Sequence, residues 1–102
     1  MKALRFHAPG DVRIEDVPEP ECGAREVKIR VRNCSTCGTD VKIRNNGHVN
    51  ITRETTMGHE VAGEVVEVGA DARGGFAVGD RVQVIAAVPC GECHECRKGW
   101  ME

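Results

Sequence analysis

Short apolar segments broken by glycine and proline are the feature that most limits how this chain can fold. Residues 26–32, EVKIRVR, alternate apolar and charged side chains one by one. A period of two predicts a strand with one buried face. Residues 61–68 are again rich in valine, but their apolar phase slips by one position near Gly63. Such a slip beside a glycine predicts a β-bulge or a sharp bend.

The remaining segments extend this β-rich pattern. They are, in order, a hairpin over residues 2–17 around the turn Pro9-Gly10-Asp11, a short helix over residues 39–44, a polar loop over residues 45–56, a turn-rich connection over residues 69–79 and a strand over residues 80–87. Low helical content and frequent glycine turns predict a mainly β fold, either a barrel or a sandwich. Aromatic residues are only 3% of the chain, so we expect a core of Val, Ile, Leu and Ala.

Charge and hydropathy exclude several classes of partner. The chain of 102 residues has 14 basic and 16 acidic residues and a net charge of -2. This balance argues against nucleic acid or an anionic membrane surface, since both reward a basic excess. We find no apolar run long enough for a signal peptide or a membrane span. We therefore expect a cytoplasmic protein, in which six reduced cysteines point to metal or catalysis before disulfides.

Three cysteines, Cys90, Cys93 and Cys96, stand three positions apart near the end of the chain. Soft thiolate ligands suit zinc or an iron–sulfur cluster. A structural zinc site normally has four ligands, so this group is one short. The bacterial ferredoxin pattern needs a fourth cysteine at position 100, and that position is Trp100.

Other partners for these cysteines fit less well. A zinc ribbon with Cys34 and Cys37 would need a gap of 52 residues where about 15–20 is usual, and it would leave Cys96 unused. A thioredoxin-like pair at Cys34 and Cys37 is expected to lack the helix start that lowers a thiol pKa. His94 directly follows a cysteine of the group, and neighbouring residues rarely point at one ion.

Two further motifs lie in the middle of the chain, CGTD at residues 37–40 and GHE at residues 58–60. One cysteine, one histidine and a further ligand, with a fourth position open, form a typical catalytic zinc site. The metalloprotease pattern His-Glu-x-x-His is not met, because its last position is Gly63. Taken alone, His59 is more often a hydrogen-bonded core histidine than a metal ligand.

The order and spacing of these motifs resemble the medium-chain, zinc-dependent alcohol dehydrogenases. The matching residues are CGTD (37–40), GHE (58–60) with the glycines at 63 and 69, GDRV (79–82) and CGECHEC (90–96). The resemblance covers essentially the whole chain, and it is strongest to the polyol, threonine and secondary-alcohol enzymes. It implies a GroES-like catalytic domain, a partly open β-barrel with a short helix and a cysteine-rich zinc lobe.

The resemblance also implies that part of the enzyme is missing. The family's structural zinc lobe has a fourth cysteine separated from the third by seven intervening residues, at what would be position 104. We therefore expect residues 1–102 to be the N-terminal part of the catalytic domain, with a truncated zinc lobe at residues 89–102. The Rossmann cofactor domain would be absent, and no Gly-x-Gly-x-x-Gly motif occurs.

Site roles follow from the resemblance, position by position. Cys37 and His59 would bind the catalytic zinc, and a third family ligand would lie beyond residue 102. Glu60 would be a carboxylate close to the metal that can coordinate it transiently. Asp40 would accept a hydrogen bond from the ligand histidine. Thr39 would receive the alcohol proton.

The implied activity is hydride transfer between a secondary alcohol or polyol and NAD or NADP, with zinc as a Lewis acid. The parent protein would be a homo-oligomer, a dimer or a tetramer, and the isolated chain would be inactive. Many relatives carry a proton-relay histidine where this chain has Lys42. Cys34 matches no family ligand and is expected to be a small core residue. The alternative, from another class, is a non-enzymatic zinc-binding module for structure or interaction.

Overall fold

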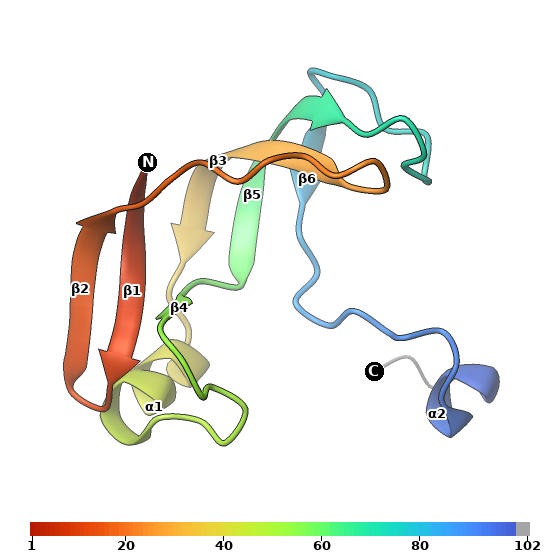
Figure 1. Cartoon of the computed structure of the whole chain (residues 1–102). Coiled ribbons are helices and arrows are strands. Elements are labelled where there is room, and N and C mark those ends of the chain that lie inside the picture. The colour runs from red at the N-terminus through yellow and green to blue at the C-terminus, as the bar shows by residue number, and fades with distance from the viewer. Residues whose placement is uncertain (100–102) are drawn as a thin grey trace.

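Residues 1–99 form two open three-stranded sheets and two short helices (Figure 1). The computed structural model describes residues 1–99, so the expectations for Trp100 and the end of the lobe at residues 89–102 fall outside the described residues. Its elements are β1 (Lys2–Ala8), β2 (Asp11–Asp16), β3 (Val27–Ser35), α1 (Gly38–Asn46), β4 (Thr55–Thr56), β5 (Glu60–Val68), β6 (Arg81–Gln83) and α2 (His94–Arg97). The mainly β class is confirmed, with open sheets in place of a closed barrel over residues 1–99.

The first sheet has the strand order β2-β1-β4, and all its pairs are antiparallel. The predicted hairpin is confirmed as β1 and β2, joined at Gly10, whose φ of 79° suits a glycine. The Gly10 N–H donates to the carbonyl of Arg44 over 2.7 Å. This bond attaches the hairpin turn to α1.

The second sheet has the order β3-β5-β6, and two bulges bend its central pair. Val66 is the extra residue on β5, at the predicted phase slip, and Arg32 is the extra residue on β3. A Cβ atom at Gly63 would lie 2.4 Å from the carbonyl oxygen of Arg30, so only glycine allows the strands to approach there. The predicted bulge is therefore confirmed, and a second one accompanies it.

The strand predicted over residues 80–87 is wrong beyond its first half. β6 ends at Gln83, and the last ladder bond runs from the Val84 N–H to the Val61 carbonyl over 2.8 Å. Within residues 1–99, the backbone of residues 85–88 forms no hydrogen bond. A strand needs a hydrogen-bonded neighbour, and an apolar run without one stays irregular. Figure 1 shows this segment leaving the sheet and running alone toward α2.

Few side chains of residues 1–99 are buried, and two residues expected to be buried, Val31 and Cys34, are exposed. The buried apolar residues are Ala3, Phe6 and Val65, so one aromatic ring shares the core with small aliphatic side chains. Val31, expected on the buried face of its strand, is 55% exposed. It pairs with Gly63, which has no side chain to cover it. Cys34 stands near the end of β3 as expected, but it is exposed and is not a core residue.

Helix α1 is longer than predicted, and β4 occupies the end of the segment predicted as a polar loop. Among residues 1–99, no helix has the length and apolarity required to traverse a membrane.

Candidate metal centres

The first candidate centre begins where β3 ends and α1 begins. Cys37 is the N-cap of α1, in an extended conformation. Its Sγ accepts the Thr39 N–H at 3.3 Å, and its own N–H donates to Asp40 Oδ2 at 2.9 Å. This is a capping box in which a thiol takes the usual place of a hydroxyl. The expectation that Cys37 lacks a helix start is therefore wrong.

His59 comes from the other side of the same pair of strands. The β3–β5 ladder ends with Ser35 opposite Glu60, so Cys37 and His59 both lie just beyond its last pair. The Nε2 atom of His59 is 3.0 Å from Cys37 Sγ. The two side chains converge, as the resemblance implies.

Asp40 completes the arrangement from the opposite edge of the imidazole ring. Its Oδ1 lies 3.4 Å from His59 Nδ1, and the residue is only 8% exposed. One carboxylate therefore holds the N-cap residue with one oxygen and faces the histidine with the other. Cys37, Asp40 and His59 form a group whose ligand atoms all lie within 4.8 Å of one another.

Contacts within the first centre shift the pKa values of Cys37 and His59 in opposite directions. The pKa of Cys37 is lowered, chiefly by hydrogen bonds from the hydroxyl and the backbone N–H of Thr39. The pKa of His59 is raised, chiefly by its bond to Cys37, with partial burial opposing and Asp40 and Glu60 adding to the rise. Without metal, these shifts favour a thiolate beside an imidazolium.

The donor set fits zinc, which binds thiolate and neutral imidazole in proteins. Ligands of one tetrahedral zinc would place a cysteine sulfur and a histidine nitrogen about 3.6 Å apart, from bond lengths of about 2.3 and 2.0–2.1 Å. Cys37 Sγ and His59 Nε2 are 3.0 Å apart, so a small separation of the pair accommodates the ion. Asp40 already faces the other ring nitrogen, where a metal-binding histidine normally finds its acceptor.

The two other predicted residues of this centre lie at its margin. Glu60 is exposed and stands outside the close group, although its charge reaches His59. Thr39 is exposed, and its hydroxyl faces Cys37. Their roles toward metal and substrate stay predictions.

The second candidate centre is the group of Cys90, Cys93 and Cys96, whose sulfurs all lie within 4.8 Å of one another. Cys90 Sγ is 3.9 Å from Cys96 Sγ. Two thiolates on one tetrahedral zinc would be about 3.8 Å apart. Gly91, with φ of 79°, turns the chain back between the first two cysteines. The loop thus presents three thiols at zinc spacing.

Backbone N–H groups tune these thiols. The N–H groups of Glu92 and Cys93 donate to Cys90 Sγ at 3.5 and 3.3 Å and lower the pKa of Cys90 to about 7. A backbone hydrogen bond with Cys96 lowers the pKa of Cys93, but its thiol contacts with Cys96 and Cys90 raise it, and the net shift is upward.

The two candidate metal groups share no residue, and this decides between the cysteine pairings considered from the sequence. A zinc ribbon would require Cys37 to join Cys90 and Cys93, but Cys37 groups with Asp40 and His59 instead. His94 lies outside the lobe group, as its position beside Cys93 suggests.

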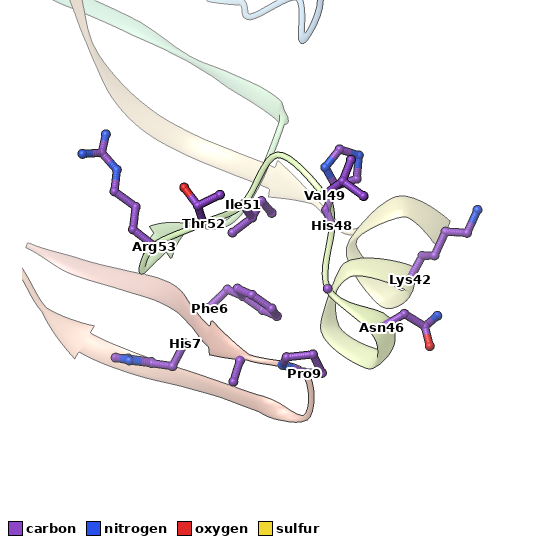
Figure 2. A pocket seen from close by; sticks show the side chains of 12 residues that line it. Phe6, His7, Pro9, Lys42, Asn46, His48, Val49, Ile51, Thr52 and Arg53 are labelled. Carbon is purple, nitrogen blue, oxygen red and sulfur yellow. The ribbon is translucent and has the colours of Figure 1, made fainter.

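A hollow of about 710 Å³ lies between the β1–β2 hairpin, α1 and residues 47–53 (Figure 2). Phe6 projects into it, and Lys42 stands on its rim. Its lining includes no cysteine and no carboxylate, so the candidate metal groups lie elsewhere.

Sequence reasoning missed one positioning contact. A Cβ atom at Gly58 would lie 2.6 Å from Cys34 Sγ, and Gly58 has a φ of +107°. The sulfur of Cys34 therefore fills the space beside the residue that precedes His59. The glycine of the GHE motif was consistent with a position that has no room for a side chain. Only the folded structure shows that the neighbouring group is the sulfur of Cys34.

Most of the chain matches a known protein family. The family model described as "Alcohol dehydrogenase GroES-like domain" matches residues 23–102. L-threonine 3-dehydrogenase of Aeromonas hydrophila subsp. hydrophila is 42% identical over 103 residues, which cover 97% of this chain and 30% of the relative. The chain thus spans about a third of the length of the curated relatives it matches.

Two solved structures are similar over nearly the whole chain. One is the zinc-dependent alcohol dehydrogenase 2 from Streptococcus pneumonia, in its apo form. Its identity is 34%, its TM-score is 0.82, and the match covers 97% of this chain and 28% of that protein. The other, from Sinorhizobium meliloti 1021, is a candidate zinc-binding dehydrogenase bound to NADP, with 33% identity, a TM-score of 0.87 and coverage of 96% and 28%. With the family model matching most of the chain, this protein belongs to the alcohol dehydrogenase GroES-like domain family.

Proposed function

We propose that these 102 residues form the N-terminal part of the catalytic domain of a zinc-dependent dehydrogenase. The enzyme would transfer hydride between a secondary alcohol or polyol and NAD or NADP. The observation that carries this proposal is the imidazole of His59 held between Cys37 Sγ and Asp40 Oδ1. The names of the relatives, an L-threonine dehydrogenase and a zinc-dependent alcohol dehydrogenase, support it.

When bound, zinc would supply a Lewis acid for an alcohol substrate, and a nicotinamide cofactor would supply the hydride acceptor. Cys37 and His59 would hold the metal. Asp40 Oδ1 lies 3.4 Å from His59 Nδ1, and an Nδ1–H that faces this carboxylate would leave the Nε2 lone pair pointing toward the position of Cys37 Sγ. Thr39, exposed beside the thiol, would take the proton of the alcohol. Glu60 would be a carboxylate within reach of the centre.

The cysteine lobe would have a separate, structural role. Cys90, Cys93 and Cys96 would supply three of four ligands to a second zinc, in the part of the domain from residue 89 onward. Closed four-ligand sites stabilise the fold and perform no chemistry. The fourth ligand, the third ligand of the catalytic zinc and the cofactor domain would belong to the remainder of the enzyme. A net charge of -2 supports a small-molecule substrate over nucleic acid.

A chimera tests the proposal directly. Residues 1–102 would replace the matching 30% of Aeromonas hydrophila L-threonine 3-dehydrogenase. We expect the chimera to reduce NAD or NADP with a secondary alcohol. Cys37→Ser and His59→Ala should abolish that activity, while Cys22→Ser, a matched thiol outside both metal groups, should retain it.

The isolated chain gives the complementary result. It should not reduce NAD or NADP with any secondary alcohol, because it carries no Gly-x-Gly-x-x-Gly motif. A folded chimera that binds zinc at Cys37 and His59 but turns over no alcohol would favour the non-enzymatic zinc module.

A further inference from the structure

We infer that Glu54 is a positioning residue for His59. Arg5 and His7 of β1 hold its carboxylate, and through it they keep the segment that leads to His59 against the first sheet. Glu54 directly precedes β4 and belongs to neither candidate metal group. The consequence for metal binding rests on the proposed function, whereas the contacts around Glu54 do not.

His59 lies where the chain crosses from one sheet to the other (Figure 1). β4 belongs to the first sheet and β5 to the second, and residues 57–59 connect them. The anchor on the β5 side is long, because Glu60–Val68 pair with β3 over most of their length. The anchor on the β4 side is short, because the strand comprises Thr55–Thr56 alone. The position of His59 therefore depends most on what reinforces β4.

Backbone hydrogen bonds give β4 little support. Its two residues pair with Arg5 and Phe6 of β1. One bond follows, from the Met57 N–H to the Leu4 carbonyl over 2.8 Å. Short paired segments are only marginally stable in water without further packing. Side-chain contacts with β1 are therefore needed to hold the segment that starts at Glu54.

The carboxylate of Glu54 makes these contacts. Its Oε1 lies 3.1 Å from His7 Nδ1, and its Oε2 lies 3.6 Å from Arg5 Nη2. The same Nη2 donates to the Glu54 carbonyl at 3.5 Å, and Arg5 Nη1 donates to Thr56 Oγ1 at 3.1 Å. Arg5 and His7 are two positions apart on β1, so their side chains stand on one face of the strand. Both carboxylate oxygens of Glu54 thus face a basic side chain of β1.

Glu15 holds the same two basic side chains from β2. Its Oε1 lies 2.7 Å from His7 Nε2, and its Oε2 lies 3.9 Å from Arg5 Nε. The side chains of His7 and Arg5 are only 16% and 22% exposed. Because Glu15 already orders both of them, their contact with Glu54 costs less conformational entropy than a contact between free surface side chains. The cluster therefore joins β2, β1 and the start of β4.

Amide hydrogen exchange of the metal-free chain, followed by NMR in EDTA, tests the role of Glu54. The Met57 amide is the reporter, since its bond to the Leu4 carbonyl breaks when the segment leaves β1. Glu54→Gln keeps the size of the side chain and removes its charge. We expect the Met57 amide of this variant to exchange roughly threefold to tenfold faster than in the wild type, as for the loss of two partly exposed ion pairs.

Glu19→Gln is the matched control. Glu19 also pairs with a basic side chain, Lys28 at 3.4 Å, and it is 70% exposed where Glu54 is 60% exposed. This change should leave Met57 exchange as it is in the wild type. His7→Gln combined with Glu54→Gln should accelerate exchange by less than the product of the two single effects, because each change alone already breaks the pair. Equal acceleration by Glu19→Gln, or independent effects of the two changes, would overturn the inference.

A second readout decides whether the effect reaches His59. In the metal-free chain, the NOE between the His59 ring and the β-protons of Cys37 reports the contact of Nε2 with Sγ. Glu54→Gln should weaken this NOE, and Glu19→Gln should not. Faster Met57 exchange with an unchanged NOE would mean that Glu54 holds β4 without positioning His59, and it would overturn the inference.

Cobalt(II) is the probe for the first metal centre, in a background with serine at positions 90, 93 and 96. At equal cobalt concentration, Glu54→Gln should give a weaker thiolate-to-cobalt absorption band than the wild type. A wild-type first centre that binds no cobalt would contradict the proposed function instead. The exchange and NOE results need no metal, so they would still decide the role of Glu54.

Discussion

The Nε2 atom of His59 lies 3.0 Å from the Sγ atom of Cys37, although 22 positions separate the two residues. The β3–β5 ladder explains this distance, because its last pair, Ser35 with Glu60, places the two residues side by side beyond the strand ends. Gly58 and Asp40 then determine how the imidazole is presented. Each of these contacts leads to a measurement.

The first prediction concerns the proton on His59 in the metal-free chain. The pKa of the His59 imidazole is raised, chiefly by its bond to Cys37. The protonated ring therefore contributes fully to the free energy of unfolding below the ordinary histidine pKa of about 6.5. This contribution is lost as the pH rises through the raised pKa. The pKa of Cys37 is lowered, chiefly by Thr39, so its contribution is complete above the ordinary thiol value and is lost as pH falls through the lowered one.

Cys37→Ser should therefore move the His59 titration midpoint down toward the ordinary value. The measurement is an NMR pH titration of the imidazole Cε1–H in EDTA. Cys22→Ser, a thiol outside both metal groups, is the matched control and should leave the midpoint in place. An unchanged midpoint in Cys37→Ser would show that the thiol does not set the charge of the ring.

The second prediction concerns Asp40, whose Oδ2 accepts the Cys37 N–H and whose Oδ1 faces His59 Nδ1 at 3.4 Å. An asparagine side chain has only one acceptor oxygen and no charge, so Asp40→Asn should lose either the cap of α1 or the carboxylate contact with His59. We expect a loss of about 1 kcal/mol in the free energy of unfolding. Zinc affinity should fall about 10–100-fold, as for other residues that orient a ligand histidine.

Urea denaturation and chelator competition would measure the two effects of Asp40→Asn. The background would carry serine at Cys90, Cys93 and Cys96, so that only the first centre binds zinc. Asp80→Asn is the control, because Asp80 also accepts a backbone N–H, from Ala77 over 2.8 Å, but belongs to neither metal group. Equal losses of zinc affinity in both variants would contradict a positioning role for Asp40.

The third prediction concerns Gly58. Gly58→Ala should cost roughly 1–2 kcal/mol of unfolding free energy for the left-handed backbone, because its φ is +107°. A further cost should arise from the overlap with Cys34 Sγ, 2.6 Å from the new Cβ. In a Cys34→Ala background this second part should disappear.

Gly75→Ala separates the two costs. Gly75 has a φ of +68°, and no atom lies within 4 Å of a Cβ placed there. Urea denaturation should therefore give a smaller loss for Gly75→Ala than for Gly58→Ala. If the two glycines cost the same in the wild-type background, the overlap with Cys34 Sγ adds nothing to the unfolding free energy.

The fourth prediction concerns the order in which the lobe thiols react. With a pKa of about 7, Cys90 is substantially thiolate at neutral pH, whereas the raised pKa of Cys93 keeps that thiol protonated. Iodoacetamide at pH 7 should therefore alkylate Cys90 before Cys93, as followed by peptide mass spectrometry. Added zinc should protect both. Faster reaction of Cys93 would mean that the backbone N–H groups do not tune Cys90.

The residues of both metal groups could be found from the sequence. The spacing of Cys90, Cys93 and Cys96 is short enough for a single loop to bring three sulfurs together, and no distant strand is needed. The hairpin and the bulge near Gly63 were also predictable, because turn residues and apolar phase act over a few positions. The family resemblance identified Cys37, Asp40 and His59 before their contact was known.

Contacts between residues far apart in sequence determined the extent of β6 and the exposure of Cys34. Residues 80–87 have the pattern of a strand, yet only Arg81–Gln83 form one, because β5 supplies partners for those residues and not beyond Val84. Cys34 is a small, apolar residue of the kind usually found in a core, yet it is exposed and its sulfur lies beside Gly58. Local patterns depend on near neighbours, so the chain encodes them directly. Strand partners and the cover over a side chain come from residues far away in sequence, and only the folded arrangement determines them.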